Sequence, residues 1–89
     1  MSYLYFLNEP TPENVRAVHA KFGATQPQMA QIAGIGLQTY KGWLAPEDSK
    51  NHRTPPVPVW NLLMHELEAR RLGFGDLQDF FQKKFKNNA

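Results

Sequence analysis

Apolar residues recur along this chain at the three- and four-residue spacing of helices that bury one face. The first such stretch begins with Thr11, Pro12 and Glu13, the order of a hydroxyl cap, a first-turn proline and a first-turn acid. The apolar positions that follow are Val15, Val18 and Phe22. Gly23 then provides a helix end. This pattern predicts a helix over residues 12–22.

Four further helices are predicted from similar signals. Thr25 and Gln28 have the spacing of a capping box, so a helix begins at Gln26. The other three are expected at residues 37–44, from 57 or 58 to 72, and after Asp76. The apolar face of the last helix consists of Leu77, Phe80, Phe81 and Phe85. The sequence therefore predicts an all-α fold, a compact bundle of four to five helices.

The remaining segments are predicted to be irregular. Residues 3–7 are apolar and precede Pro10, so we expect a short strand or an extended arm there. This run is too short for a signal-peptide core or a membrane span, which predicts a cytoplasmic protein with no membrane contact. Residues 46–58 are rich in proline and predict a long exposed connection. We expect one domain over residues 1–89, with an arm (1–10), a core (11–72) and a last helix with a basic tail (73–89).

The segment from residue 26 to residue 45 has the pattern of a helix-turn-helix. Ala30 is small where the second helix must cross the first closely. Gly34 stands four residues later, where the chain turns in a left-handed conformation that glycine adopts at little cost. The apolar positions expected to hold these helices to each other and to a third are Met29, Ala33, Ile35, Tyr40 and Trp43.

Composition narrows the possible functions. The chain has 89 residues, 42% of them apolar, which is enough for one small core. It has no cysteine, which excludes a disulfide framework and a thiolate metal site and fits a reducing cytoplasm. The net charge is only +2, but bases gather locally, as at Lys83, Lys84 and Lys86. Such patches suit DNA binding without requiring it.

The second helix of a helix-turn-helix enters the major groove of DNA, where its first residues reach the base edges. Gln38 would form paired hydrogen bonds to adenine, Lys41 would reach guanine or a phosphate, and Leu37 would touch a thymine methyl group. Thr39 would bond a phosphate through its hydroxyl. In a protein that binds no DNA, Gln38 and Lys41 are ordinary solvated residues and Leu37 is a protein contact.

Phosphate contacts are also expected outside this helix. Gln26 begins the first helix of the motif, where free N–H groups and the helix dipole favour an anion. The bases of the following loop are placed to grip the DNA backbone, although such loop residues are often simply solvated. The predicted DNA-binding residues are Gln26, Gly36, Leu37, Gln38, Thr39, Lys41, Lys50, His52 and Arg53.

The sequence gives little support for an enzymatic function. His65 and Glu66 begin like a zinc-protease helix, but Ala69 stands where the second histidine is needed. Gly34 and Gly36 resemble the start of a dinucleotide fingerprint, but no strand is predicted before them. We therefore expect no enzymatic activity, no metal, no cofactor and no small-molecule ligand.

The chain resembles the Cro and lambda-repressor class of helix-turn-helix proteins, the XRE type, over about residues 11–72. The residues that carry the resemblance are Thr25, Gln26, Met29, Ala30, Gly34, Ile35, Gly36, Thr39, Tyr40 and Trp43. Arg53, Thr54, Pro55 and Pro56, followed by Trp60 and Leu63, are similar to small phage and mobile-element regulators of this class, including those encoded beside anti-CRISPR genes. The resemblance implies dimers on paired half-sites and DNA-facing roles for Gln26, Leu37, Gln38 and Lys41.

The chain departs from the family pattern at two places. After Trp43 the family often has Glu and then Gly, whereas this chain continues with Leu44, Ala45 and a long proline-rich loop. Gly36 stands where a Ser or Thr cap is frequent, a change that costs roughly a few tenths of a kcal/mol.

Together these patterns favour a sequence-specific transcriptional regulator, a repressor that binds a palindromic operator in double-stranded DNA as a homodimer. The alternative is a protein-interaction module, such as an antitoxin or adaptor that keeps the helix-turn-helix fold. The apolar arm and the phenylalanine-rich last helix favour this alternative. The same two segments hold the surplus apolar residues that a homodimer would bury, and the sequence leaves open which of them forms the dimer.

Overall fold

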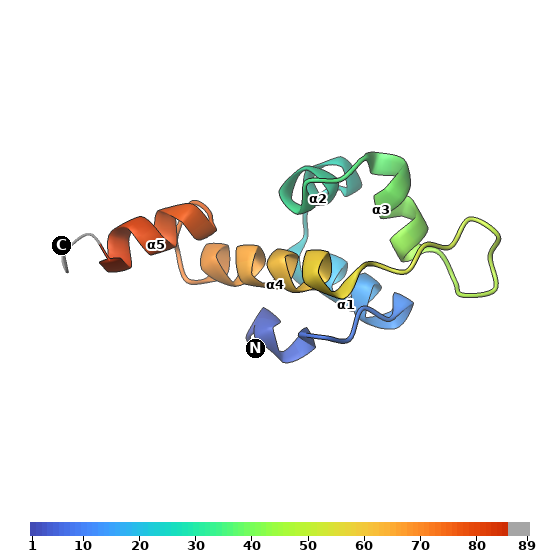
Figure 1. Ribbon diagram of the computed structural model, residues 1–89, viewed down its shortest axis with the longest axis horizontal. Helices are drawn as coiled ribbons and strands as arrows, with labels where there is room; N and C mark the ends of the chain where they lie inside the picture. Colours follow the sequence, from blue (N-terminus) through green and yellow to red (C-terminus); the bar gives the residue numbers. More distant parts are fainter. Residues whose placement is uncertain (86–89) are drawn as a thin grey trace.

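The computed structural model describes residues 1–85, and the secondary structure within this range is helical (Figure 1). A short 3-10 helix, η1 (Tyr3–Phe6), precedes five α-helices. Their bounds are α1 (Pro12–Phe22), α2 (Gln26–Ala33), α3 (Leu37–Leu44), α4 (Val57–Arg71) and α5 (Leu77–Phe85). The prediction of an all-α bundle is confirmed. None of the helices in this range is both long and apolar enough to cross a membrane. Lys86, part of the predicted basic tail, lies outside the described residues.

The helix ends follow the local sequence signals. Thr11 Oγ1 accepts a hydrogen bond from the backbone N–H three residues on, at 3.1 Å. Thr25 and Gln28 form the reciprocal capping box that their spacing predicts. Gly34 ends α2 with a φ of 73°, in the left-handed region that favours glycine, so α3 can start after a short turn.

α4 is the central element of the core, because it packs against η1, α2 and α5. Its buried residues from Trp60 to Leu67 follow the three- and four-residue spacing of one helix face. The core consists of Tyr3, Val15, Val18, Met29, Ala30, Tyr40, Trp43, Trp60, Leu63, Met64 and Leu67. Full burial of one such large side chain contributes about 1.5–3 kcal/mol. The predicted core positions Met29, Tyr40 and Trp43 are confirmed, while Ala33 and Ile35 are partly buried.

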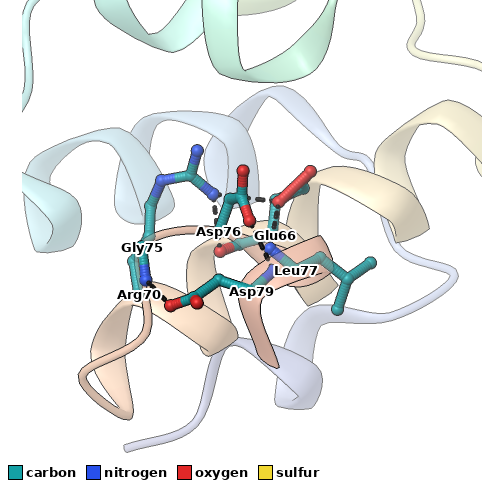
Figure 2. A network of polar contacts seen from close by, with 6 residues as sticks. All are labelled: Glu66, Arg70, Gly75, Asp76, Leu77 and Asp79. Atoms are coloured by element: carbon teal, nitrogen blue, oxygen red, sulfur yellow. Dashed lines mark hydrogen bonds and ion pairs between the residues drawn. The ribbon is translucent and has the colours of Figure 1, made fainter. Parts of the chain in front are cut away.

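α5 begins at a network of caps that Figure 2 shows from close by. Asp76 Oδ1 accepts the Asp79 N–H at 2.7 Å, and Asp79 Oδ2 accepts the Gly75 N–H at 2.7 Å. Glu66 of α4 reaches the same helix end, where its Oε1 accepts the Leu77 N–H at 2.8 Å. The predicted cap at Asp76 is confirmed, and α5 is held to α4 at its first turn.

The N-terminal segment differs from the prediction, because η1 is a helical turn and not a strand or an extended arm. Side chains of α4 provide the partners that hold it. Trp60 Nε1 donates to the Phe6 carbonyl at 2.8 Å. Asn61 accepts from the Asn8 N–H and donates to the Asn8 side chain, both at 2.8 Å. The segment therefore folds back along α4 of its own chain.

Glu68 fixes the first residues of this segment to α4. It is 9% exposed, and its Oε1 accepts the Tyr3 N–H at 2.9 Å. Arg71 donates to both carboxylate oxygens, from Nε at 2.9 Å and from Nη2 at 2.7 Å. The hydrogen bonds from Arg71, helped by the Tyr3 N–H and opposed by burial, lower the pKa of Glu68 from 4.5 to about 2.

Glu68 makes the stability of the fold sensitive to acid. A carboxylate whose pKa is lowered by folding stabilises the native state above about pH 4.5, and this contribution is lost as the pH falls toward 2. We predict that Glu68→Gln lowers the free energy of unfolding at pH 7 by about 1–3 kcal/mol, because the Tyr3 N–H and the Arg71 guanidinium lose a charged acceptor. Denaturant titrations at several pH values measure this.

The matched control is Glu47→Gln, in the exposed loop, which should leave the stability unchanged. The difference in free energy of unfolding between wild type and Glu68→Gln should shrink between about pH 4.5 and pH 2, as the Glu68 carboxylate of the wild type becomes protonated. A deficit of the same size throughout that interval would contradict a stabilising role for the carboxylate charge.

Candidate nucleic-acid interface

The exposed face of α3 carries polar side chains that the sequence assigns to DNA. Gln38, Thr39 and Lys41 are exposed, whereas Tyr40 and Trp43 are each 1% exposed and belong to the core. Successive residues of an α-helix are rotated by about 100°, so burying Tyr40 and Trp43 turns the opposite side of α3, with Gln38 and Lys41 near its centre, outward. The structure thus places three predicted residues on the outer side of one helix.

Two contacts from α1 fix α3 behind this face. Arg16 Nε donates to the Leu44 carbonyl at 3.0 Å, which satisfies a free acceptor at the end of α3. His19 Nδ1 lies 2.8 Å from the Tyr40 hydroxyl. Burial raises the pKa of Tyr40 to about 12, so this hydroxyl stays protonated at neutral pH. α3 is therefore held at its middle and at its end.

The first turn of α3 has no side-chain cap. Gly36 is the N-cap residue and has no side chain that can accept a hydrogen bond. The N–H groups of Leu37, Gln38 and Thr39 are consequently left for solvent or for a ligand. The Leu37 side chain is half-buried beside them. This helix end can donate hydrogen bonds to an anion that approaches the exposed face.

The start of α2 is less open than the start of α3. Thr25 Oγ1 already accepts the Gln28 N–H at 3.2 Å, and Pro27 has no N–H. The N–H of Gln26 is therefore the one remaining donor in the first turn of α2. The predicted phosphate contact at Gln26 stays a prediction, with a single backbone donor to support it.

The loop after α3 folds back onto the helix at Gly42. The Arg53 N–H donates to the Gly42 carbonyl at 2.9 Å. A Cβ atom at position 42 would lie 2.7 Å from Arg53 Cγ and 2.9 Å from the Asn51 carbonyl oxygen, so only glycine permits this approach. The sequence analysis missed this role, although a glycine inside a helix costs about 0.5–1 kcal/mol against alanine and so signals a close contact.

His52 links the loop to the end of α3. Its Nδ1 lies 3.0 Å from the Ala45 carbonyl oxygen, which only accepts, so Nδ1 carries a hydrogen. Its Nε2 lies 3.2 Å from Thr54 Oγ1. Arg53 Nη1 also donates to the His52 carbonyl at 2.9 Å. Both ring nitrogens of His52 therefore have partners within the loop, and the prediction that it grips DNA directly has no support from this geometry.

A polar cleft of about 470 Å³ lies between α3 and the loop. Its lining consists of Gln38, Thr39, Lys41, Gly42, Ala45, Ser49, Asn51 and Arg53. The cleft thus joins four predicted DNA-binding residues, Gln38, Thr39, Lys41 and Arg53. Five others lie outside its lining, namely Gln26, Gly36, Leu37, Lys50 and His52. Ser49 and Asn51 were not predicted, because short polar residues are common in any exposed loop.

The cleft has groups suited to a phosphate diester. Lys41 contributes a cation from α3 and Arg53 contributes one from the loop, and the lining also includes residues with hydroxyl and amide side chains. Arginine and lysine are the side chains that most often neutralise phosphates, and the hydroxyl and amide groups can complete the hydrogen bonds. Among residues 1–85 no group of His, Cys, Asp or Glu is arranged to hold a metal ion.

Comparisons with known proteins add no assignment to this geometry. No protein-family model, no curated protein and no solved structure matches this chain.

Gly42 gives a direct test of the docked loop. We predict that Gly42→Ala releases the loop and leaves the helices intact, because the added Cβ collides with the loop while alanine favours helix. Hydrogen exchange of the Arg53 amide should become about five-fold faster or more, which corresponds to a lost hydrogen bond of about 1 kcal/mol. The control is Gly36→Ala, where a Cβ meets no atom within 4 Å. Unchanged exchange in Gly42→Ala would show that the loop does not depend on this approach.

Proposed function

We propose that this chain binds double-stranded DNA with sequence specificity, inserts α3 into the major groove and regulates transcription. The observation that carries the proposal is the combination, on α3, of an outward polar face, an uncapped first turn and a cleft whose lining includes two cations. A recognition helix needs side chains that reach base edges and donors that bind the flanking phosphates, and α3 offers both.

Gln38 is the residue that we assign to base reading. Its side-chain amide presents one donor and one acceptor, which match the N7 and N6 groups of adenine in the major groove. Lys41 follows one turn later and would reach guanine or the phosphate at the cleft. Leu37 would contact a thymine methyl group, and Thr39 would bond a phosphate.

The docked loop would extend the interface beyond α3. A phosphate seated in the cleft would meet Lys41 of α3 and Asn51 and Arg53 of the loop, which line it. Lys50 is exposed outside the cleft and would add long-range attraction to the DNA backbone. His52 would act through the loop that it holds, and not as a phosphate ligand.

On DNA, the proposed form is a homodimer that acts as a repressor on a palindromic operator. One recognition helix reads only a few base pairs, and two copies related by a two-fold axis read half-sites about 34–36 Å apart, one turn of duplex. The resemblance to the Cro and lambda-repressor class supports this form. It also supports a cytoplasmic regulator of phage or mobile-element type.

A protein-interaction module, such as an antitoxin or adaptor, is the second candidate. The observation that favours it is the exposed apolar surface of α5, where Phe81 is 48% and Phe85 is 59% exposed. Duplex binding that weakens with salt separates the two candidates, because phosphate contacts release counterions and apolar protein contacts do not.

The assignment of Gln38 predicts a loss of discrimination. Gln38→Ala should lower the affinity for the preferred duplex by about 1–3 kcal/mol and relax the preference at one base position. Fluorescence anisotropy with preferred and scrambled duplexes measures both effects. The control is Gln31→Ala, an exposed glutamine of α2 outside the cleft. An unchanged ratio of the two affinities in Gln38→Ala would contradict the assignment.

The assignment of Arg53 to a phosphate contact predicts an effect on the salt dependence of binding and not on base preference. Arg53→Gln should weaken binding to preferred and scrambled duplexes equally and reduce the salt slope by about one unit, because one phosphate contact is lost. Lys83→Gln removes the same charge from α5, away from the cleft, and should leave the slope unchanged. Equal slopes in wild type and Arg53→Gln would remove Arg53 from the interface.

A further inference from the structure

The arginines of this chain differ in what neutralises their charge. Arg70 and Arg71 of α4 each form an ion pair with a glutamate of their own helix, at 3.0 Å and 2.7 Å. Arg16 of α1 and Arg53 of the loop are exposed, and neither has an ion pair among residues 1–85. The two guanidinium groups without a carboxylate partner therefore come from the two segments that hold α3.

Each of these two arginines is anchored to a backbone carbonyl. Arg16 Nε donates to the Leu44 carbonyl at 3.0 Å, and Arg53 Nη1 donates to the His52 carbonyl at 2.9 Å. A guanidinium carries its N–H groups in a rigid planar fork, so one bond restricts the side chain and leaves other donors for an anion. This restriction lowers the entropy that is lost when the group binds a phosphate.

α1 and the loop contact α3 on nearly opposite sides. The contacts from α1 are those of His19 with the Tyr40 hydroxyl and of Arg16 with the Leu44 carbonyl. Tyr40 and Leu44 are four residues apart and so share a side of the helix. The loop contacts α3 at Gly42. Gly42 is rotated by about 160° from Tyr40 around the helix axis, so α1 and the loop flank α3.

The exposed side of α3 lies between these two flanks, with Gln38 and Lys41 near its centre. A helix with its side chains is about 10–12 Å in diameter and the major groove is about 12 Å wide, so a helix that enters the groove fills it. The walls of the groove are the phosphate backbones of the two DNA strands. The segments that flank α3 would therefore meet one strand each.

We infer that Arg16 is a further phosphate-binding residue, and that it contacts the DNA strand opposite to the one that Arg53 contacts. The inference rests on the proposed function and deepens it, because it adds α1 to the interface and assigns one arginine to each wall of the major groove. Arg16 has this position because its bond to the Leu44 carbonyl holds it at the end of α3.

The first test is the salt dependence of duplex binding by the full chain. Arg16→Gln should weaken binding to preferred and scrambled duplexes equally and reduce the salt slope by about 0.9 unit, the value for one phosphate. Combining Arg16→Gln with Arg53→Gln should reduce the slope by about twice as much, because the two contacts are separate. Arg16→Lys should restore the slope, because it keeps the charge.

The matched control is Lys21→Gln, which removes the same charge from α1. Lys21 Nζ lies 4.8 Å from the centre of the Tyr3 ring, on the side of α1 that faces the N-terminal segment. Its replacement should leave the salt slope unchanged. Circular dichroism of each variant checks that the helices remain.

The second test replaces single phosphates of the preferred duplex with uncharged methylphosphonates. Wild type should lose about five- to ten-fold in affinity at about 0.1 M salt when the phosphate bound by Arg16 is replaced. The same replacement should cost Arg16→Gln nothing, whereas a variant that had only loosened α3 would still respond to it. The phosphate assigned to Arg53 in the same way should lie on the other strand of the half-site.

Equal slopes in wild type and Arg16→Gln would overturn this inference alone. So would sensitive phosphates confined to one strand of each half-site, a result that wild type can give without any variant. A wild type that binds no duplex would overturn the proposed function and this inference together.

Discussion

The burial of one side of α3 is the constraint on which the rest of the structure depends. Tyr40 and Trp43 are each 1% exposed, and they pack into the core shared by α1, α2 and α4. Their burial leaves the helix one orientation, in which Gln38 and Lys41 face outward. The hydrogen bond from Arg16 to the Leu44 carbonyl and the contact between His19 and Tyr40 hold α3 in this orientation. The apolar core thus decides which polar groups the molecule presents.

The loop side of the cleft depends on the absence of a side chain at Gly42 and not on apolar burial. Gly42 lies on the side of α3 next to the loop, and the absence of a side chain there allows the backbone of residues 51–53 to approach. The hydrogen bonds of His52 and of the Arg53 N–H complete the attachment. These contacts attach the loop to α3, so that Lys41 of the helix and Arg53 of the loop line the same cleft.

Features that depend on neighbouring residues could be predicted from the sequence, and features that depend on distant partners could not. The capping box at Thr25 and the left-handed turn at Gly34 are local, so their residue types identify them. For residues 3–7 the sequence predicts a strand or an extended arm, and the observed turn η1 differs because its shape depends on Glu68 and other residues of α4 more than fifty positions away. The exposed face of α3 could be predicted from the helical period of its apolar residues. The cleft could not be predicted, because no local pattern shows that the loop returns to Gly42.

Selection of bound sequences from random duplexes would show whether α3 reads DNA. The full chain is mixed with a randomised duplex library, bound molecules are recovered and amplified, and the enriched sequences are compared with the starting pool. We expect enrichment of one short motif, arranged as an inverted repeat when two copies bind together. A recovered pool with the base composition of the starting library, at salt low enough to detect phosphate contacts, would contradict the claim that α3 is a recognition helix.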